Sequence, residues 1–115
     1  MEAATTTIKY DDFARLELRV ATVIECKPVP KSNKLLVLQI ELGNGERRQI
    51  LAGIGKAYQS EQLIGKQVVV VANLEPATIF GETSQGMLLA ASDASTGQVI
   101  VISPSEPIAP GSQVK

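Results

Sequence analysis

The chain has 115 residues, a net charge of −1 and 44% hydrophobic residues, which suits a single folded domain with one core. It contains no histidine and one cysteine, Cys26, so Ser-His-Asp and Cys-His catalysis, the usual zinc sites and an internal disulfide are excluded. No apolar stretch approaches the ~18 residues of a membrane span, and the N-terminus lacks the layout of a secretory signal. A cytoplasmic protein that does not enter a membrane is expected.

Basic residues are concentrated in the middle of the sequence. From Lys27 to Lys66, seven basic residues stand against three acidic ones, a local charge of +4, and the rest of the chain carries −5. Such a split can give an acidic protein one positive face, and a phosphate responds to charge within a Debye length of roughly 10 Å. The alternative is that these residues are ordinary solvated strand edges, and charge alone does not separate the two.

The N-terminal part of the domain predicts a helical turn followed by a long strand. Asp11 or Asp12 is placed to cap the turn through its carboxylate. Strict alternation of polar and apolar residues then predicts a half-buried strand over residues 16–26. Its expected inward face consists of Leu16, Leu18, Val20, Thr22, Ile24 and Cys26.

A proline-containing loop follows this strand. Pro28 and Pro30 cannot donate to a strand ladder, so the strand ends there. Lys31 and Lys34 project from the loop. Alternation resumes over residues 35–42, which predicts a second strand.

The second strand ends at Gly43-Asn44-Gly45, a sequence typical of tight turns. The chain is expected to return as a third strand from Arg47 to Ala52. Because Arg47 and Arg48 are neighbours beside the turn, at least one of them must point to solvent.

A short helix over residues 60–64, capped by Ser60, is predicted to end at Gly65. Four consecutive valines, residues 68–71, then predict a strand that is covered on both faces. Asn73 emerges at the end of this strand.

The C-terminal part predicts a hairpin of residues 87–91 and 98–102, followed by a tail over residues 103–115 that its prolines keep extended. Three strands, a short helix and two more strands is the order of a five-stranded Greek-key barrel, the OB-fold. An unrelated small β barrel is the alternative. We expect residues 1–7 to be a flexible leader and residues 8–115 to form the single domain.

Several separated motifs occur in a fixed order. They are Asp11-Asp12-Phe13, Leu18-Arg19-Val20, Lys34-Leu35, Leu63-Ile64-Gly65-Lys66, Val71-Ala72-Asn73-Leu74-Glu75-Pro76, Gly81 and Ser84-Gln85-Gly86-Met87-Leu88-Leu89-Ala90-Ala91. From Ile8 to the C-terminus, the chain resembles the tRNA-binding domain family. That family includes freestanding bacterial tRNA-binding proteins and the C-terminal domain of many methionyl-tRNA synthetases.

The resemblance implies a non-catalytic OB-fold homodimer that binds tRNA by shape, alone or as an accessory to an aminoacyl-tRNA synthetase. It implies no cofactor and no metal. The family pattern contributes Lys34, Asn73, Ser84, Gly86 and Met87 to the tRNA surface, and the basic segment adds Lys31, Arg47 and Arg48.

Each of these positions also has a purely structural alternative. Asn73 and Ser84 are residue types that often satisfy nearby backbone groups, and Met87 is a common core residue. Relatives often carry basic residues where this chain has Ala77 and Thr78, which favours a second function, a chaperone-like or scaffold protein that binds peptides. The initial methionine favours a whole protein over a domain cut from a synthetase.

Overall fold

The computed structural model describes residues 6–115. The predicted leader, residues 1–7, therefore lies mostly outside the described residues. Within 6–115, none of the helices has the length and apolar character needed to span a membrane.

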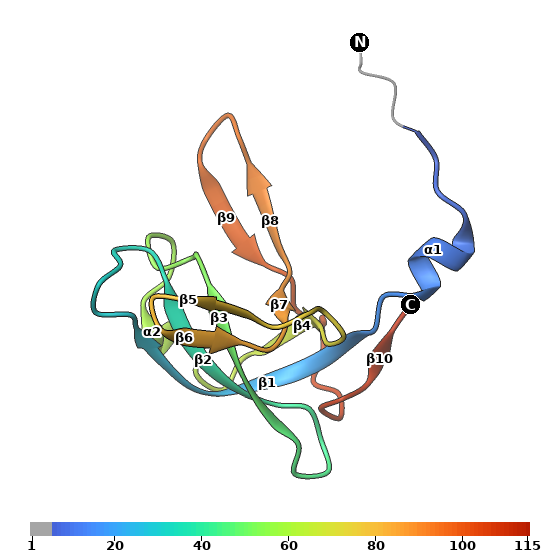
Figure 1. Cartoon of the computed structure of the whole chain (residues 1–115), viewed down its shortest axis with the longest axis horizontal. Helices are drawn as coiled ribbons and strands as arrows, with labels where there is room; N and C mark the ends of the chain where they lie inside the picture. The colour runs from blue at the N-terminus through green and yellow to red at the C-terminus, as the bar shows by residue number, and fades with distance from the viewer. Residues whose placement is uncertain (1–5) are drawn as a thin grey trace.

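An antiparallel sheet curls into a nearly closed barrel of five strands (Figure 1). In sheet order the strands are β3 (Arg47–Ala52), β2 (Leu36–Glu41), β1 (Leu18–Pro28), β4 (Gln67–Val71) and β7 (Met87–Leu88). Helix α2 (Ser60–Leu63) lies between β3 and β4 in the chain, as predicted. The expected all-β, five-stranded OB-fold barrel is confirmed.

Two hairpins are added to the barrel. Strands β5 (Ala77–Ile79) and β6 (Glu82–Ser84) form one within the connection from β4 to β7. Strands β8 (Ala90–Asp93) and β9 (Gln98–Val101) form the other, which projects from the barrel in Figure 1. The second hairpin forms in the region where residues 87–91 and 98–102 were expected to pair, but its first strand begins at Ala90, and residues 87–88 pair with β4 instead. The first hairpin was not anticipated.

The valine strand β4 is buried on both faces, as its sequence predicts. Val68 and Val70 belong to the main barrel core, together with large side chains such as Leu38 and Ile50. The alternate residues of β4 pack on a second cluster outside the barrel, which holds Leu18 and the aromatic ring of Phe13.

The first strand differs from its predicted pattern. A β-bulge shifts the β1–β2 register between Val23 and Glu25, and a bulge reverses the faces to which later side chains point. Val23 and Cys26 therefore both belong to the barrel core, whereas Leu18 packs on the outer cluster and Leu16 is exposed. The expectation of one shared inward face from Leu16 to Cys26 was wrong, although Cys26 is buried and burial raises the pKa of its thiol.

The two helix caps also differ from the predicted ones. Helix α1 spans Tyr10–Ala14, with Lys9 at the N-cap and no side-chain capping bond. Asp11 and Asp12 lie inside its first turn, where their charge suits the helix dipole. Helix α2 is capped by Gln59, whose backbone N–H donates to the Gln62 side chain at 2.6 Å.

The C-terminal tail ends in a short strand, β10 (Gln113–Val114), that pairs with the start of β1. The prolines keep residues 103–112 out of the sheet, but the last residues contribute to it. Val114 and Phe13 pack on the same outer cluster, so the C-terminus lies beside α1 (Figure 1).

Candidate nucleic-acid interface

The loop between β1 and β2 presents the two predicted lysines on a braced backbone. The Val29 amide donates to the Leu35 carbonyl at 3.0 Å, and the Ser32 hydroxyl accepts from the Lys34 amide at 3.2 Å. Lys31 and Lys34 are both exposed. These hydrogen bonds within the loop support its backbone, and the two lysine side chains extend into solvent.

The tip of the β5–β6 hairpin lies against this loop. Phe80 and Gly81 both have positive φ angles, +52° and +79°, which is the geometry of a tight two-residue hairpin turn. The Phe80 ring is 57% exposed and shares a surface depression with Lys31 and Lys34. Two cationic side chains therefore border the same depression as an aromatic ring, a combination suited to phosphates and unpaired bases.

An apolar cavity of about 330 Å³ adjoins that depression. Its lining includes Leu35 and Ile79, the chain neighbours of Lys34 and Phe80. Ser84, Gly86 and Met87 also line it. The structure thus gathers five of the eight predicted residues, Lys31, Lys34, Ser84, Gly86 and Met87, along one side of the barrel.

Ser84 has a structural task at this place. Its side chain is almost completely buried, and its hydroxyl accepts from the Leu51 amide at 2.9 Å and donates to the Gly86 carbonyl at 2.9 Å. Gly86 is needed for close packing, because a Cβ there would lie 2.9 Å from the Val71 carbonyl oxygen. Met87, by contrast, is 45% exposed and free to meet a ligand.

Arg47 and Arg48 point in different directions. Arg47 is exposed and lies opposite Glu41 in the β2–β3 ladder. Arg48 is directed to the end of the barrel, where it forms a fork with Glu46, at 2.8 Å from Nη2 and 3.1 Å from Nε to Oε2. Its Nη1 donates to the Ala72 carbonyl and, at 3.5 Å, to the Gln85 carbonyl.

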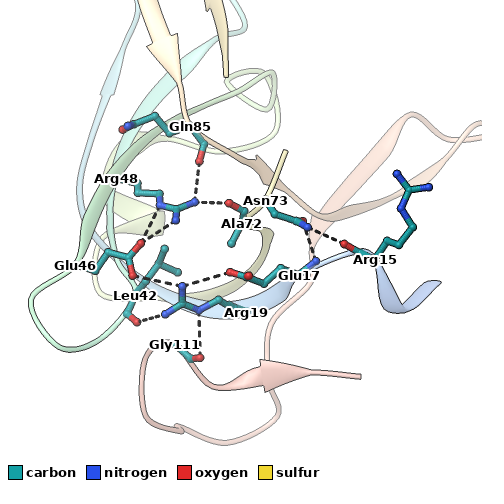
Figure 2. A network of polar contacts seen from close by, with 10 residues as sticks. All are labelled: Arg15, Glu17, Arg19, Leu42, Glu46, Arg48, Ala72, Asn73, Gln85 and Gly111. Carbon is teal, nitrogen blue, oxygen red and sulfur yellow. Dashed lines mark hydrogen bonds and ion pairs between the residues drawn. The ribbon is translucent and has the colours of Figure 1, made fainter. Parts of the chain in front are cut away.

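Glu46 joins Arg48 to a second arginine (Figure 2). Arg19 Nη1 lies 3.4 Å from Glu46 Oε1, and Arg19 also donates to the carbonyls of Leu42 and Gly111, at 2.9 and 3.4 Å. The hydrogen bond from Arg48 holds the pKa of the Glu46 carboxyl below its usual value. With Glu17 at 3.6 Å from Arg19, this network contains two positive and two negative charges.

Asn73 belongs to the same end of the barrel. Its side-chain oxygen accepts from the Glu17 amide at 2.8 Å, and its side-chain nitrogen donates to the Arg15 carbonyl at 2.7 Å (Figure 2). Both polar atoms of Asn73 therefore tie the segment after α1 to the barrel. This is the backbone-satisfying role that the sequence left open.

The polar contacts that close the barrel were not identified from the sequence. Gln85 donates its amide to the Gln49 carbonyl at 2.8 Å, and its side chain accepts from the Gln49 amide at 3.2 Å. These bonds replace a regular ladder between β3 and the segment before β7. The only sequence signal for them is the position of Gln85 within the motif that includes Ser84 and Gly86.

The sequence of this chain matches a known family over most of its length. The sequence model of the family described as "Putative tRNA binding domain" matches residues 18–113. The chain belongs to this tRNA-binding domain family.

The relatives named here are enzymes much longer than this chain, which matches one part of each. The chain is 48% identical over 108 residues to a methionine–tRNA ligase of Clostridium perfringens, covering 94% of this chain and 16% of the ligase. It is 47% identical over 114 residues to a methionine–tRNA ligase of Thermotoga maritima, covering 99% of this chain and 18% of the ligase. The chain spans less than a fifth of the length of these ligases.

Two solved structures share almost the whole fold. A MetRS-related protein of Pyrococcus horikoshii superimposes with a TM-score of 0.90 at 32% identity, covering 96% of this chain and all of that chain. The chaperone CsaA of Bacillus anthracis superimposes with a TM-score of 0.85 at 29% identity, with the same coverage.

Proposed function

We propose that this chain is a non-catalytic domain that binds folded tRNA by its shape and backbone. The observation that carries this proposal is the meeting of Lys31, Lys34 and the exposed Phe80 ring on one side of a barrel from the tRNA-binding domain family. Family membership supplies the ligand class, and the surface supplies a means of binding it.

The physical basis is replacement of counterions on the RNA by fixed cations. Each phosphate neutralised steepens the fall of log affinity with log salt concentration by roughly 0.7 to 0.9. A-form RNA hides its base edges in a deep groove, so phosphates and 2′-hydroxyls are the features that a rigid surface can read. Lys31 and Lys34 provide cations on this side of the barrel, and Phe80 and Met87 provide apolar contacts beside them. Arg47, exposed at the other end of the β2–β3 ladder, provides a separate cation.

The test is an anisotropy titration with folded tRNA and with an unstructured RNA of the same length. Substituting both Lys31 and Lys34 by Ala is expected to weaken tRNA binding and to reduce the salt slope by about 1.4 to 1.8, because two phosphate contacts are lost. Lys66→Ala is the matched control, because Lys66 is also exposed but lies in a different depression, beside residues 103–107.

Two results would reject the proposal. Equal affinity for the two RNAs would remove shape selectivity. An effect of Lys66→Ala as large, per charge removed, as that of the loop substitutions would mean that binding reflects overall charge and not this surface.

We further propose that two copies pair and that the domain serves an aminoacyl-tRNA synthetase in the cytoplasm. The relatives that are methionine–tRNA ligases support the synthetase partner. Exposed apolar side chains on the terminal segments, Ile8, Tyr10, Leu16 and Ile108, support pairing of two copies. Size-exclusion chromatography with light scattering tests the dimer, and a monomer mass at micromolar concentration would contradict it.

A chaperone-like function is the second candidate, favoured by one observation. The cavity of about 330 Å³ is lined almost entirely by apolar side chains, such as Leu51, Ile54 and Leu88, and an unfolded peptide can fill such a cavity with an apolar residue. The structural likeness to the chaperone CsaA points the same way. Binding to a peptide array, with no tRNA affinity at low salt, would favour this function over the first.

A further inference from the structure

We propose that Arg48 is a positioning residue for RNA binding, a clasp that holds the hairpin-bearing loop in place without contacting a phosphate itself. This inference rests on the proposed function. It assigns different roles to two adjacent arginines that sequence patterns do not distinguish: Arg47 faces the solvent, and Arg48 faces the protein.

The first observation is where the Arg48 guanidinium makes its contacts. Its Nη1 donates to the carbonyls of Ala72 and Gln85, which are the first and the next-to-last residues of the connection (72–86) that carries the β5–β6 hairpin. One side chain on β3 therefore joins both ends of this connection (Figure 2). Because the ends are joined, the hairpin has fewer accessible orientations relative to the barrel.

The second observation is charge. Arg48 is paired with Glu46 through two hydrogen bonds, and Glu46 in turn pairs with Arg19. A phosphate approaching Arg48 would have to displace a carboxylate that already occupies its fork. The guanidinium is therefore committed to the protein, and little of its charge is available to a polyanion.

The third observation is what the loop carries. The tip of the hairpin holds Phe80 against Lys31 and Lys34, and its base continues into Ser84 and the apolar cavity. Loosening the clasp would move the aromatic face relative to the lysines. Binding of a rigid RNA corner depends on their fixed arrangement.

Glu46→Ala distinguishes a clasp from a phosphate contact by the sign of its effect. Removing a negative charge next to a phosphate contact would free Arg48 and tighten binding to tRNA. Removing the carboxylate that orients a clasp would instead weaken binding, by about two- to thirtyfold. The matched control is Glu41→Ala, which removes the same charge opposite Arg47 without touching the clasp and is expected to leave affinity unchanged or to raise it.

Arg48→Lys provides a second, independent measurement. Lysine keeps the charge but cannot form the planar fork to Glu46 and reach both carbonyls. The clasp predicts that Arg48→Lys weakens tRNA binding without changing the salt slope, whereas Arg47→Ala reduces the slope by about 0.7 to 0.9. All titrations are run at temperatures where circular dichroism shows each variant folded.

The outcomes distinguish a failure of the proposed function from a failure of the clasp alone. If the wild-type chain does not prefer folded tRNA, the proposed function fails and the clasp fails with it. If the wild-type chain binds, but Glu46→Ala binds more tightly or Arg48→Lys binds like wild type, only the clasp is overturned. Weaker binding by both variants, at an unchanged salt slope for Arg48→Lys, supports it.

Discussion

Removing the Ser84 hydroxyl is expected to destabilise the domain more than removing the hydroxyl of an exposed serine would. The hydroxyl accepts from the amide of Leu51, a buried strand residue, and donates to the Gly86 carbonyl, both at 2.9 Å. In Ser84→Ala, the unsatisfied amide costs about 1–3 kcal/mol and the lost bond to the carbonyl about 0.5–1.5 kcal/mol. We expect a loss of about 2–4 kcal/mol, a large share of the ~5–15 kcal/mol typical of a domain.

Urea unfolding followed by far-UV circular dichroism measures this loss. With a slope of about 2 kcal/mol per molar urea, the middle of the usual range of about 1–3, the unfolding midpoint should fall by roughly 1–2 M. Ser92→Ala is the matched control, because Ser92 is exposed on β8. Ser84→Thr keeps the hydroxyl and directs its extra methyl group towards the adjoining cavity, so it should cost less than about 1.5 kcal/mol.

The reasoning is refuted if Ser84→Ala and Ser92→Ala differ by less than about 0.5 kcal/mol, the usual range of surface substitutions. In that case, the seam between β3 and the segment before β7 would be held by other contacts.

Three further outcomes are expected. Asn73→Ala removes both bonds to the segment after α1, so hydrogen exchange should quicken around Arg15 while the barrel is unaffected, and unchanged exchange would contradict this role. Gly111→Ala should lower the thermal midpoint, because its φ is +89° and a Cβ would lie 2.1 Å from a carbonyl oxygen of the β2–β3 connection; an unchanged midpoint would mean that the tail can shift freely. Because the hydrogen bond from Arg48 lowers the pKa of Glu46 below its ordinary value, this pair stabilises the fold at pH values above that ordinary pKa, and the contribution is lost as pH falls through the lowered value. The stability difference between wild type and Glu46→Ala, measured in urea, should therefore narrow in acid, and a constant difference would argue against the pair.

Local patterns predicted much of the fold. The run of valines over residues 68–71 indicated a strand covered on both faces, and the structure buries all four. The Gly43-Asn44-Gly45 turn forms, with the Glu46 amide donating to the Gly43 carbonyl at 2.9 Å. In both cases the pattern that predicts the element lies within a few residues along the chain, where sequence rules apply directly.

The first strand shows a limit of prediction from local sequence patterns. Its alternation was real, but one bulge near Ile24 moved the later residues to the opposite face. A bulge depends on how the neighbouring strands pair, and the sequence of the bulged strand alone does not predict that pairing.

The candidate site shows the same limit. The sequence selected Arg47 and Arg48 together, and only the register of β3 decides which of them reaches the solvent. It also selected Asn73 and Ser84 as surface groups, whereas their polar atoms make hydrogen bonds within the protein. Contact of these residues with RNA stays a prediction, which the titrations test.

What the sequence determined by itself is the order of the strands, the turns and the positive segment, because each follows from residues close together in the chain. The tertiary structure decided which polar groups close the barrel and which remain free for a ligand. Leu51 and Ser84 are 33 positions apart, and Arg48 and Gln85 are 37 apart. Contacts at that separation form only when the strands pair in the tertiary structure. They decide which of two chemically similar side chains stabilises the fold and which stays free for a ligand.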